Sequence, residues 1–376
     1  MSRTQRPPTA DALGFLPDPP IRCRRFAIGC VGAGFIMADV QLAAYAEAGF
    51  PVVAIASRTP ANAARVAARW GIARVHDTPL ELLDDRAVEI VDLAYPPDQQ
   101  PALIRTALGK PHIRAILAQK PLAMDFAEAA ALVAEAAAAG KPLSVNQNMR
   151  FDQSMRVLRQ LLDRGDLGDP VLATIEMRAV PHWQPFLAQY GRLTLLNMAI
   201  HHLDILRFLL GEPVSIYTAA RADPRTGFAH TDGITVSTLR FASGALAVSM
   251  EDVWAGPREP GFQSDHHIKW RLEGLDGVAQ GTIGWPDYPE GSPSTLGYAS
   301  RTTTGGEWRH PSWTTRWFPH AFAGVMEQLQ HAVDAGTPPE LDAADNVRTM
   351  ALVEAAYRSL AERREVRLDE IGELKA

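Results

Sequence analysis

The segment that most constrains the fold is 26–37, which reads FAIGCVGAGFIM. An apolar run of strand length ends there at Gly32 and Gly34, where a helix can begin. A glycine at the end of a strand allows a tight turn, and a second glycine lets the backbone approach a ligand. The N–H groups that begin the helix then point at an anion. Met37 stands where a small residue is usual. The segment predicts a site for the pyrophosphate of a dinucleotide, although such glycine pairs also occur in ordinary turns.

The residues after this turn complete a βαβ unit and indicate which dinucleotide binds. A helical segment at 38–49 is followed by Pro51 and an apolar run at 52–56. About 25 positions after the first glycine, such folds usually place Asp or Glu on the adenosine ribose. This chain has Ser57 and Arg58 there. A carboxylate would repel a 2′-phosphate, whereas a hydroxyl and a guanidinium attract one, so NADP is favoured over NAD; alternatively, Arg58 stacks on adenine or faces solvent.

Composition is typical of a soluble enzyme. The 376 residues predict about two domains, and a net charge of −6 without a basic stripe argues against nucleic-acid binding. Cys23 and Cys30 are too few for a disulfide framework or a zinc site, so we expect a cytoplasmic protein without a metal. No apolar run reaches the roughly 18 residues of a membrane span.

The N-terminus superficially resembles a twin-arginine export signal, because Arg24 and Arg25 precede an apolar stretch. That stretch is the predicted strand and glycine turn, and cleavage after it would remove the phosphate site. We therefore expect the proline-rich residues 1–24 to form a flexible extension.

Alternating strand and helix signals predict the first domain. Strands are expected at 90–94, 115–118 and 143–145, and helices at 61–70, 98–108 and 125–139. This order is typical of a doubly wound parallel sheet, so residues 25–146 are predicted to form a Rossmann domain.

The pattern changes after residue 168, where strand-like runs follow one another. They lie at 171–180, 214–221, 233–241, 244–252, 267–273 and 277–283, with helices at about 197–210, 319–335 and 342–363. Residues 147–376 are therefore predicted to form a second α/β domain with an open, mostly antiparallel sheet.

Lys120 is the first candidate catalytic residue. It stands between Gln119 and Pro121, directly after a predicted parallel strand, at the sheet edge where ligands bind. A partly desolvated ammonium has a lowered pKa suited to proton transfer. The alternative is an exposed lysine at the start of a helix.

A second group of polar residues lies on one predicted helix. Asn197, His201 and Asp204 are spaced by four and three residues and so share one helix face. His202 points about 100° away and is expected to pack or to face solvent. A structural histidine is the alternative reading, and no second ligand pair with zinc-like spacing accompanies it.

The polar run 146–150 follows a strand at the domain crossover. It can be a simple turn, but in a dinucleotide-binding chain it borders the nicotinamide.

Together these residues resemble the Gfo/Idh/MocA oxidoreductase family over about residues 25–365. The resemblance rests on Gly32 to Ile36, Pro96-Pro97-Asp98, Lys120-Pro121, Asn148 with Arg150, the helix of Asn197, His201 and Asp204, and the segments 273–277 and 355–359. It implies a Rossmann domain, a second α/β domain whose open sheet often forms homodimers or homotetramers, and NAD(P)-linked oxidation or reduction of sugars, polyols or their derivatives. The implied cofactor contacts are Gly32, Gly34, Phe35, Ile36, Ser57, Arg58, Pro96, Pro97, Gln100, Gln119, Lys120 and Asn148.

Three positions depart from the family pattern. Gln119 replaces the usual glutamate, Gln100 stands where histidine is common, and Asn197 replaces a frequent aspartate. An aspartate can stabilise a protonated histidine, whereas an amide can only orient it. Proton transfer is therefore expected to rest on Lys120 and His201.

The expected reaction is hydride transfer between nicotinamide C4 and a secondary alcohol carbon of a carbohydrate-like substrate. Lys120 or His201 accepts the hydroxyl proton in the oxidative direction. The expected substrate contacts are Lys120, Asn148, Arg150, His182, Trp183, His201 and Asp204, of which Trp183 can equally be loop packing. Alternatives are a keto-sugar reductase, an isomerising enzyme that retains its cofactor, and a non-catalytic NAD(P)-binding regulator.

Overall fold

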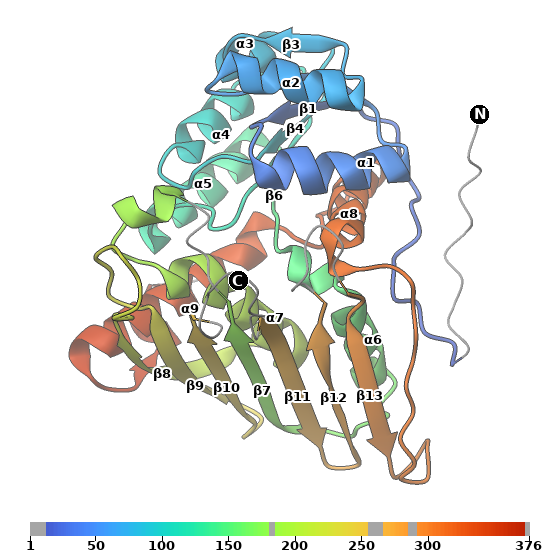
Figure 1. Cartoon of the computed structure of the whole chain (residues 1–376), viewed down its shortest axis with the longest axis vertical. Coiled ribbons are helices and arrows are strands. Elements are labelled where there is room, and N and C mark those ends of the chain that lie inside the picture. Colours follow the sequence, from blue (N-terminus) through green and yellow to red (C-terminus); the bar gives the residue numbers. More distant parts are fainter. Residues whose placement is uncertain (1–12, 180–184, 255–265, 285–291, 373–376) are drawn as a thin grey trace. The chain divides into compact units, whose positions relative to one another are not determined.

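The computed structural model of the chain describes residues 13–179, 185–254, 266–284 and 292–372 (Figure 1). The chain divides into two units by its internal contacts. Among the described residues, the first unit consists of 18–151 and 318–350, and the second unit consists of the rest. Each unit is built on its own sheet.

The first unit has a six-stranded sheet in the order β3-β2-β1-β4-β5-β6. All neighbouring strands are parallel. The strands are β1 (Ile28–Val31), β2 (Val52–Ala56), β3 (Arg74–His76), β4 (Ile90–Leu93), β5 (Ala115–Ala118) and β6 (Leu143–Val145). The strand order reverses between β1 and β4, as in a Rossmann domain. The predicted doubly wound parallel sheet is confirmed.

One helix of this unit begins and ends at residues that cap it. The carboxylate of Asp125 accepts a hydrogen bond from the N–H of Glu128 at 2.9 Å and so begins α5 (Phe126–Ala139). The helix ends at Gly140, whose φ of 63° is left-handed. The other helical elements are η1 (Ile36–Gln41), α1 (Leu42–Ala48), α2 (Pro60–Trp70), α3 (Pro79–Asp84), α4 (Gln100–Leu108), η2 (Asn148–Phe151), α8 (Phe322–Ala335) and the start of α9 (Ala343–Glu362).

Residues 318–350, which we expected in the second domain, belong to the first unit. The side chain of Gln330 in α8 donates to the carbonyl of Phe26 at 2.7 Å and accepts from its N–H at 2.9 Å. Glu327 forms an ion pair with Arg22 at 2.9 Å. These contacts place α8 beside the chain that leads into β1. A pattern read in chain order does not reveal this return, because the contacts join residues about 300 positions apart.

The described part of the segment that we expected to be flexible, residues 13–24, is divided between the two units, and its first part is packed. Phe15 is only 1% exposed. Its ring meets that of Tyr298 edge to face at 5.9 Å, and the guanidinium of Arg164 lies 4.3 Å from its centre. The first part of this segment, through Pro17, belongs to the second unit, and the remainder to the first.

The second unit has an eight-stranded sheet in the order β13-β12-β11-β7-β10-β9-β8-β14. Its strands are β7 (Pro170–Arg178), β8 (Pro213–Arg221), β9 (Ile234–Phe241), β10 (Leu246–Asp252), β11 (His267–Gly274), β12 (Gly277–Ile283), β13 (Thr295–Ser300) and β14 (Val366–Arg367). Neighbouring strands are antiparallel except β7 and β10, which are parallel. The predicted open, mostly antiparallel sheet is confirmed.

One face of this sheet carries helices, as the alternation of its side chains requires. In β7, Ala173, Ile175 and Met177 are buried and the residues between them are partly exposed. Helix α6 (Gln153–Asp163) contacts β12 and β13, and α7 (Ile200–Leu210) contacts β7 and β10 (Figure 1).

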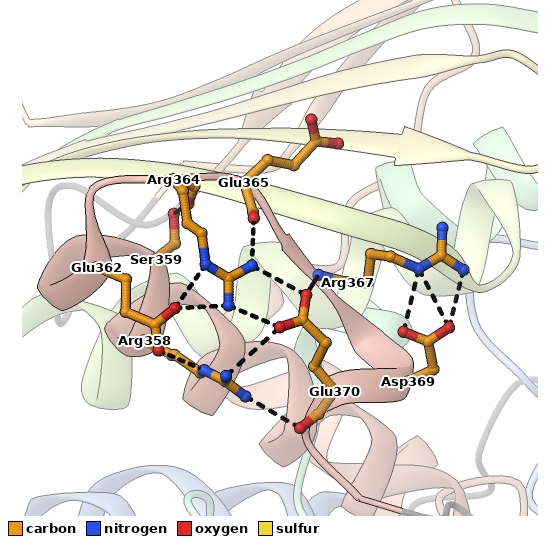
Figure 2. Close-up of polar contacts among 8 residues, drawn as sticks. All are labelled: Arg358, Ser359, Glu362, Arg364, Glu365, Arg367, Asp369 and Glu370. Carbon is orange, nitrogen blue, oxygen red and sulfur yellow. Dashed lines mark hydrogen bonds and ion pairs between the residues drawn. The ribbon is translucent and has the colours of Figure 1, made fainter.

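The C-terminal segment covers one edge of this sheet. Strand β14 pairs antiparallel with β8, with Val366 opposite Ile216. A network of ion pairs surrounds this segment: Arg358–Glu362, Arg358–Glu370, Arg364–Glu362, Arg364–Glu370 and Arg367–Asp369 (Figure 2). A single exposed pair contributes at most about 1 kcal/mol, but the network holds the chain that shields the free backbone groups of β8.

Within the described ranges, no helix has the length and apolarity needed to cross a membrane.

Candidate active site

The glycine turn follows β1 at the point where the strand order reverses. Gly32 has a φ of 117°, and a Cβ at this residue would lie 2.4 Å from the carbonyl oxygen of Ala94. Only glycine fits there. A Cβ on Gly34 would meet no atom within 4 Å, so the backbone at this residue borders open space. The carbonyl of Gly34 accepts a hydrogen bond from the N–H of Ala38 at 2.8 Å, and a helix therefore begins directly after the turn. Met37 is completely buried in that helix.

The end of β2 carries the residues expected at the adenosine ribose. The hydroxyl of Ser57 donates to the carbonyl of Thr59 at 2.7 Å and accepts from the N–H of Thr59 at 3.2 Å. Ser57 is therefore part of a tight turn and only 5% exposed, whereas Arg58 is exposed. Burial raises the pKa of Tyr95, and the nearby Arg58 guanidinium opposes that rise. Arg58 thus lies near the β4–α4 loop that contains Pro96 and Pro97.

Lys120 lies two residues beyond β5, at the carboxyl end of the parallel sheet. Burial lowers the pKa of Lys120 from 10.5 to about 7. The residue is not the exposed helix-start lysine of the alternative interpretation, because α5 begins only at Phe126. Its N–H donates to the side-chain oxygen of Gln119 at 3.0 Å.

The 146–150 turn follows β6, next to the end of β5 that leads to Lys120. The N–H of Asn146 donates to the carbonyl of Ala118, the last residue of β5, at 2.8 Å. Asn148 donates to the side-chain oxygen of Asn146 at 3.2 Å, and Arg150 forms an ion pair with Asp345 at 2.7 Å. The first unit therefore brings Lys120, Asn148 and Arg150 to one end of its sheet.

Gln147 belongs to this turn and was not among the predicted site residues. It is 2% exposed, and neither atom of its side-chain amide has a hydrogen-bond partner among the described residues. A buried amide with unsatisfied donors and acceptors is costly unless a ligand or water binds it. That its amide is buried without a partner cannot be predicted from the sequence, because adjacent Asn and Gln residues usually form an ordinary polar turn.

The second unit places Asn197, His201 and Asp204 on one continuous helical segment. The segment begins with a wide turn, η5 (Leu195–Ala199), and continues as α7. All three residues are at most 6% exposed. The ring of His201 meets that of Trp317 edge to face at 6.3 Å, and Asp204 lies 3.7 Å from Arg207.

Two buried acids that sequence reasoning missed anchor this helical segment. Asp232 accepts hydrogen bonds from the N–H groups of Leu193 and Leu195 at 2.9 and 2.8 Å and from the hydroxyl of Tyr357 at 2.9 Å. It therefore satisfies donors at the start of η5. In the sequence, Asp232 precedes a glycine and indicates only a turn.

The second acid is Glu251 in β10, which faces His202. The two side chains are fully buried, with 3.0 Å between His202 Nδ1 and Glu251 Oε1. The hydroxyls of Thr235 and Ser249 also donate to Glu251. His202 is thus packed in the interior, which is one of the two environments that we expected for it. The available signal was a glutamate at an inward position of a predicted strand.

Two predicted contacts, His182 and Trp183, lie outside the described residues. In the described part of the chain, no three His, Cys, Asp or Glu side chains gather in a way that could hold a metal ion.

Comparison with known proteins decides the family. A profile described as an oxidoreductase family with an NAD-binding Rossmann fold matches residues 26–147, and a Gfo/Idh/MocA C-terminal domain profile matches residues 155–277. Inositol 2-dehydrogenase 1 of Saccharopolyspora erythraea is 30% identical over 341 residues, which cover 85% of this chain and 97% of that protein. The chain belongs to the Gfo/Idh/MocA family. The resemblance inferred from its motifs is confirmed.

Other relatives of this Gfo/Idh/MocA protein agree. D-apiose dehydrogenase of Rhizobium rhizogenes is 27% identical over 343 residues, covering 89% of this chain and 95% of that protein. A solved oxidoreductase from Agrobacterium radiobacter, in complex with NAD+, L-tartaric acid and magnesium, has the same fold with a TM-score of 0.77 and 24% identity, and covers 92% of this chain and 99% of that one. The Gfo/Idh/MocA protein is therefore an NAD(P)-dependent oxidoreductase. The preference for NADP stays a prediction.

Proposed function

We propose that this oxidoreductase transfers a hydride between nicotinamide C4 of NAD(P) and a secondary alcohol carbon of a sugar, polyol or related small molecule. The observation that carries the proposal is the setting of Lys120. Its amine lies at the carboxyl end of a parallel strand, and burial lowers its pKa to about 7. Such a group can accept or donate a proton near neutral pH. The relatives named for D-apiose and inositol support the substrate class.

The residues of the first unit fit a dinucleotide. Gly32 and Gly34 leave room for a pyrophosphate, and Phe35 and Ile36 begin the helix whose N–H groups would bind it. The unsatisfied amide of Gln147 supports a further polar contact near Lys120. When bound, NAD(P) supplies the atom that accepts or releases the hydride. The remaining proposed contacts of the cofactor are Ser57, Arg58, Pro96, Pro97, Gln119, Lys120 and Asn148.

In this proposal, side chains of the protein carry out the acid–base chemistry. Lys120 takes the hydroxyl proton in the oxidative direction and, as a cation, stabilises the developing alkoxide. His201 is the second proton carrier, and Asn197 orients it by hydrogen bonding. The proposed substrate contacts are Lys120, Asn148, Arg150, His182, Trp183, His201 and Asp204.

A panel of sugars and polyols tests this function. The purified protein is incubated with each compound and with NAD+ or NADP+, and the absorbance of reduced nicotinamide is followed. We expect turnover of at least one polyol or cyclic sugar. Tight cofactor binding without turnover of any compound, in either direction, would instead favour the non-catalytic regulator.

The direction of the reaction has an alternative. A keto-sugar reductase, or an enzyme that oxidises and re-reduces its substrate with the same cofactor, would use the same groups, because hydride transfer is reversible. Product formation without release of reduced nicotinamide would identify the cofactor-retaining enzyme.

The preference for NADP over NAD is proposed from the end of β2. Arg58 is exposed beside Tyr95. Ser57 and Arg58 directly follow β2, and neither carries a carboxylate that would repel a 2′-phosphate. We expect Arg58→Ala to weaken NADPH binding by about tenfold or more and NADH binding by much less. Only NADPH has a 2′-phosphate, so only NADPH loses a charged hydrogen bond to the guanidinium. Fluorescence titration of both reduced cofactors measures the two dissociation constants.

A matched variant adds the missing carboxylate. Ser57→Asp is expected to shift the ratio of affinities toward NADH, because the new carboxylate accepts from a ribose hydroxyl and repels a phosphate. Equal loss of both cofactors in Arg58→Ala, together with an unchanged ratio in Ser57→Asp, would place both residues away from the ribose.

We further propose that a second copy of the chain binds the face of the eight-stranded sheet that is turned away from the described helices α6 and α7. Tyr217, Val236 and Leu246 are 45%, 41% and 38% exposed on strands β8, β9 and β10. Val236 lies opposite Met250 in β10 and Ala219 in β8, so these side chains form one apolar row. Tyr217 and Leu246 lie opposite Thr238 and Arg240, so they add exposed apolar side chains on either side of polar residues. An exposed apolar row on a sheet face is a candidate binding surface. A homodimer or homotetramer would cover it.

Charge placed on this face tests the assembly. We expect the wild-type protein to sediment as a dimer or tetramer and Val236→Glu to shift it toward the monomer, because a buried unpaired carboxylate strongly destabilises an interface. Leu80→Glu is the control, since Leu80 is 54% exposed in the first unit, on α3. A wild-type monomer, or an unchanged mass for Val236→Glu, would contradict the proposal.

A cytoplasmic location is proposed as well. Cys23 and Cys30 are buried free thiols, which are stable in a reducing compartment. Fractionation of cells that express the full chain tests this location.

A further inference from the structure

The side chain of Gln100 makes four hydrogen bonds to the loop that carries Lys120. Its Nε2 donates to the carbonyls of Gln119, Pro121 and Leu122 at 2.8, 2.7 and 3.0 Å. Its Oε1 accepts from the N–H of Gln119 at 3.1 Å. All four distances are within hydrogen-bond range, and because the amide nitrogen carries two hydrogens, one of these is shared between two of the three carbonyls.

Gln100 is itself held firmly. It is completely buried and is the first residue of α4, where its own N–H donates to the carbonyl of Pro96 at 2.9 Å. A side chain on the first turn of a packed helix has little freedom to move. The 119–122 loop is therefore fixed relative to α4 through one carboxamide.

We propose that Gln100 is the positioning residue of Lys120, and that it acts on the reaction through the 119–122 loop rather than by contacting the cofactor. The inference rests on the proposed role of Lys120 as the proton carrier. Gln100 bonds the residue before Lys120 through both its N–H and its carbonyl, and the residue after it through its carbonyl. The N–H of Lys120 is bonded in turn to the side chain of Gln119. The backbone on each side of the ammonium is thereby fixed.

The chemistry of the contact requires a carboxamide. One amide offers two N–H donors and a carbonyl acceptor, and the 119–122 loop presents three carbonyls and one N–H. A neutral imidazole offers one donor and one acceptor, so it would satisfy half of these groups. Without any partner, the buried loop carbonyls would each cost about 1 to 3 kcal/mol, and the loop would move to recover hydrogen bonds with water. Lys120 would move with it, toward solvent.

The expected consequence is a change in Lys120 and not in the glycine turn. A displacement of about 1 Å in a catalytic group can lower kcat by roughly 10²-fold. A more hydrated ammonium has a pKa closer to 10.5 than to 7, since burial is the cause of the lowering. The pyrophosphate contacts of Gly32 and Gly34 lie on a different loop, so affinity for NAD(P)H should change by less than about threefold.

The test compares Gln100→Met, which keeps the size of the side chain and removes its hydrogen bonds, with Gln99→Met as control. Gln99 is the adjacent residue, and its side chain donates to the carboxylate of its neighbour Asp98 at 3.4 Å. The chain has five lysines, so reductive ¹³C-methylation gives few NMR signals, and Lys120→Ala assigns that of Lys120. This titration reports the pKa of Lys120 without any substrate.

We expect the Lys120 signal to titrate near pH 7 in the wild type and in Gln99→Met, and at clearly higher pH in Gln100→Met. In parallel, kcat of Gln100→Met on the best substrate of the panel should fall by about 10²-fold. Gln100→His should lie between the two, because it retains one donor and one acceptor, and it decides the case if Gln100→Met does not fold. If the folded Gln100 variants kept the wild-type titration of Lys120 and the wild-type kcat, the inference would be overturned. It would also be overturned by a loss of NAD(P)H affinity equal to the loss of kcat, which would make Gln100 a cofactor contact. If Lys120→Ala were fully active, the proposed function would fail instead.

Discussion

Replacement of Lys120 by alanine is expected to lower kcat by about 10² to 10⁴-fold, the usual contribution of a general acid–base group. Affinity for NAD(P)H should stay within a few-fold, because the glycine turn at Gly32 and Gly34 would hold the pyrophosphate independently. Steady-state kinetics and cofactor titration measure the two quantities separately. Lys120→Ala with wild-type kcat would remove the central residue of the proposed mechanism.

The pKa of Lys120 also fixes the pH dependence. The neutral amine is the base in the oxidative direction, so kcat for alcohol oxidation should rise with pH and level off above about 7. The ammonium is the acid in the reductive direction, so kcat for ketone reduction should fall above the same pH. Lys120→Arg is the matched control, because it keeps a cation that does not titrate in this range. It should lose both transitions.

His201 provides the second half of this test. If Lys120 and His201 pass one proton between them and solvent, His201→Ala should lower kcat by a similar factor, and the double variant should be little worse than either single one. Multiplicative losses would instead mean that the two residues act independently.

The sequence predicted the parts of the fold that depend on local patterns. The apolar runs at 52–56 and 115–118 are buried parallel strands, and the glycine at 32 is required because its φ is positive and its Cβ would meet Ala94. Strand β3 was missed, because its three residues are mostly exposed and form no apolar run. The wide turn η5 was missed as well, since spacing alone cannot distinguish it from an ordinary helical turn.

The sequence suggested a chemistry for the candidate site but did not reveal the contacts that hold its residues in place. Lys120 stood out because a lysine follows a buried strand. Gln100 was assigned to the cofactor from family resemblance, yet its hydrogen bonds go to backbone groups that no sequence pattern displays. Asp232 bonds a helix start about 40 residues earlier in the chain. Contacts of this kind depend on tertiary packing, which cannot be predicted from local sequence patterns.

A buried acid beneath the glycine turn should make folding depend on pH. Asp92 in β4 is completely buried. The amide of Gln41 donates to both of its oxygens at 2.8 Å, and the hydroxyl of Tyr45 donates to one of them at 2.7 Å. Burial raises the pKa of Asp92 from 3.8 to about 7, although the hydrogen bonds from Tyr45 and Gln41 oppose the rise. Gln41 ends η1, and Tyr45 lies in α1, so the cluster ties the helices after the glycine turn to the centre of the sheet.

The sign of the effect follows from which state binds the proton. Between pH 3.8 and about 7, folded Asp92 keeps a proton that the unfolded chain has released. Unfolding therefore releases a proton, and the free energy of unfolding falls as the pH rises through this range, by at most about 1.4 kcal/mol per pH unit and about 4 kcal/mol in all. Asp92→Asn has no proton to lose. Its stability relative to the wild type should therefore increase by several kcal/mol between about pH 4 and pH 8.

Urea unfolding of the wild type and Asp92→Asn at the two pH values measures this difference, and other titrating groups cancel because both proteins contain them. Tyr45→Phe gives the matched test of opposite sign. It removes a hydrogen bond that favours the carboxylate, so it should destabilise the protein more at about pH 8 than at about pH 5. An equal stability difference between wild type and Asp92→Asn at both pH values would show that Asp92 is ionised in the folded protein throughout. The buried carboxylate would then carry its charge beside Gln41 and Tyr45, and the helices after the glycine turn would be anchored by an ion rather than by a neutral acid.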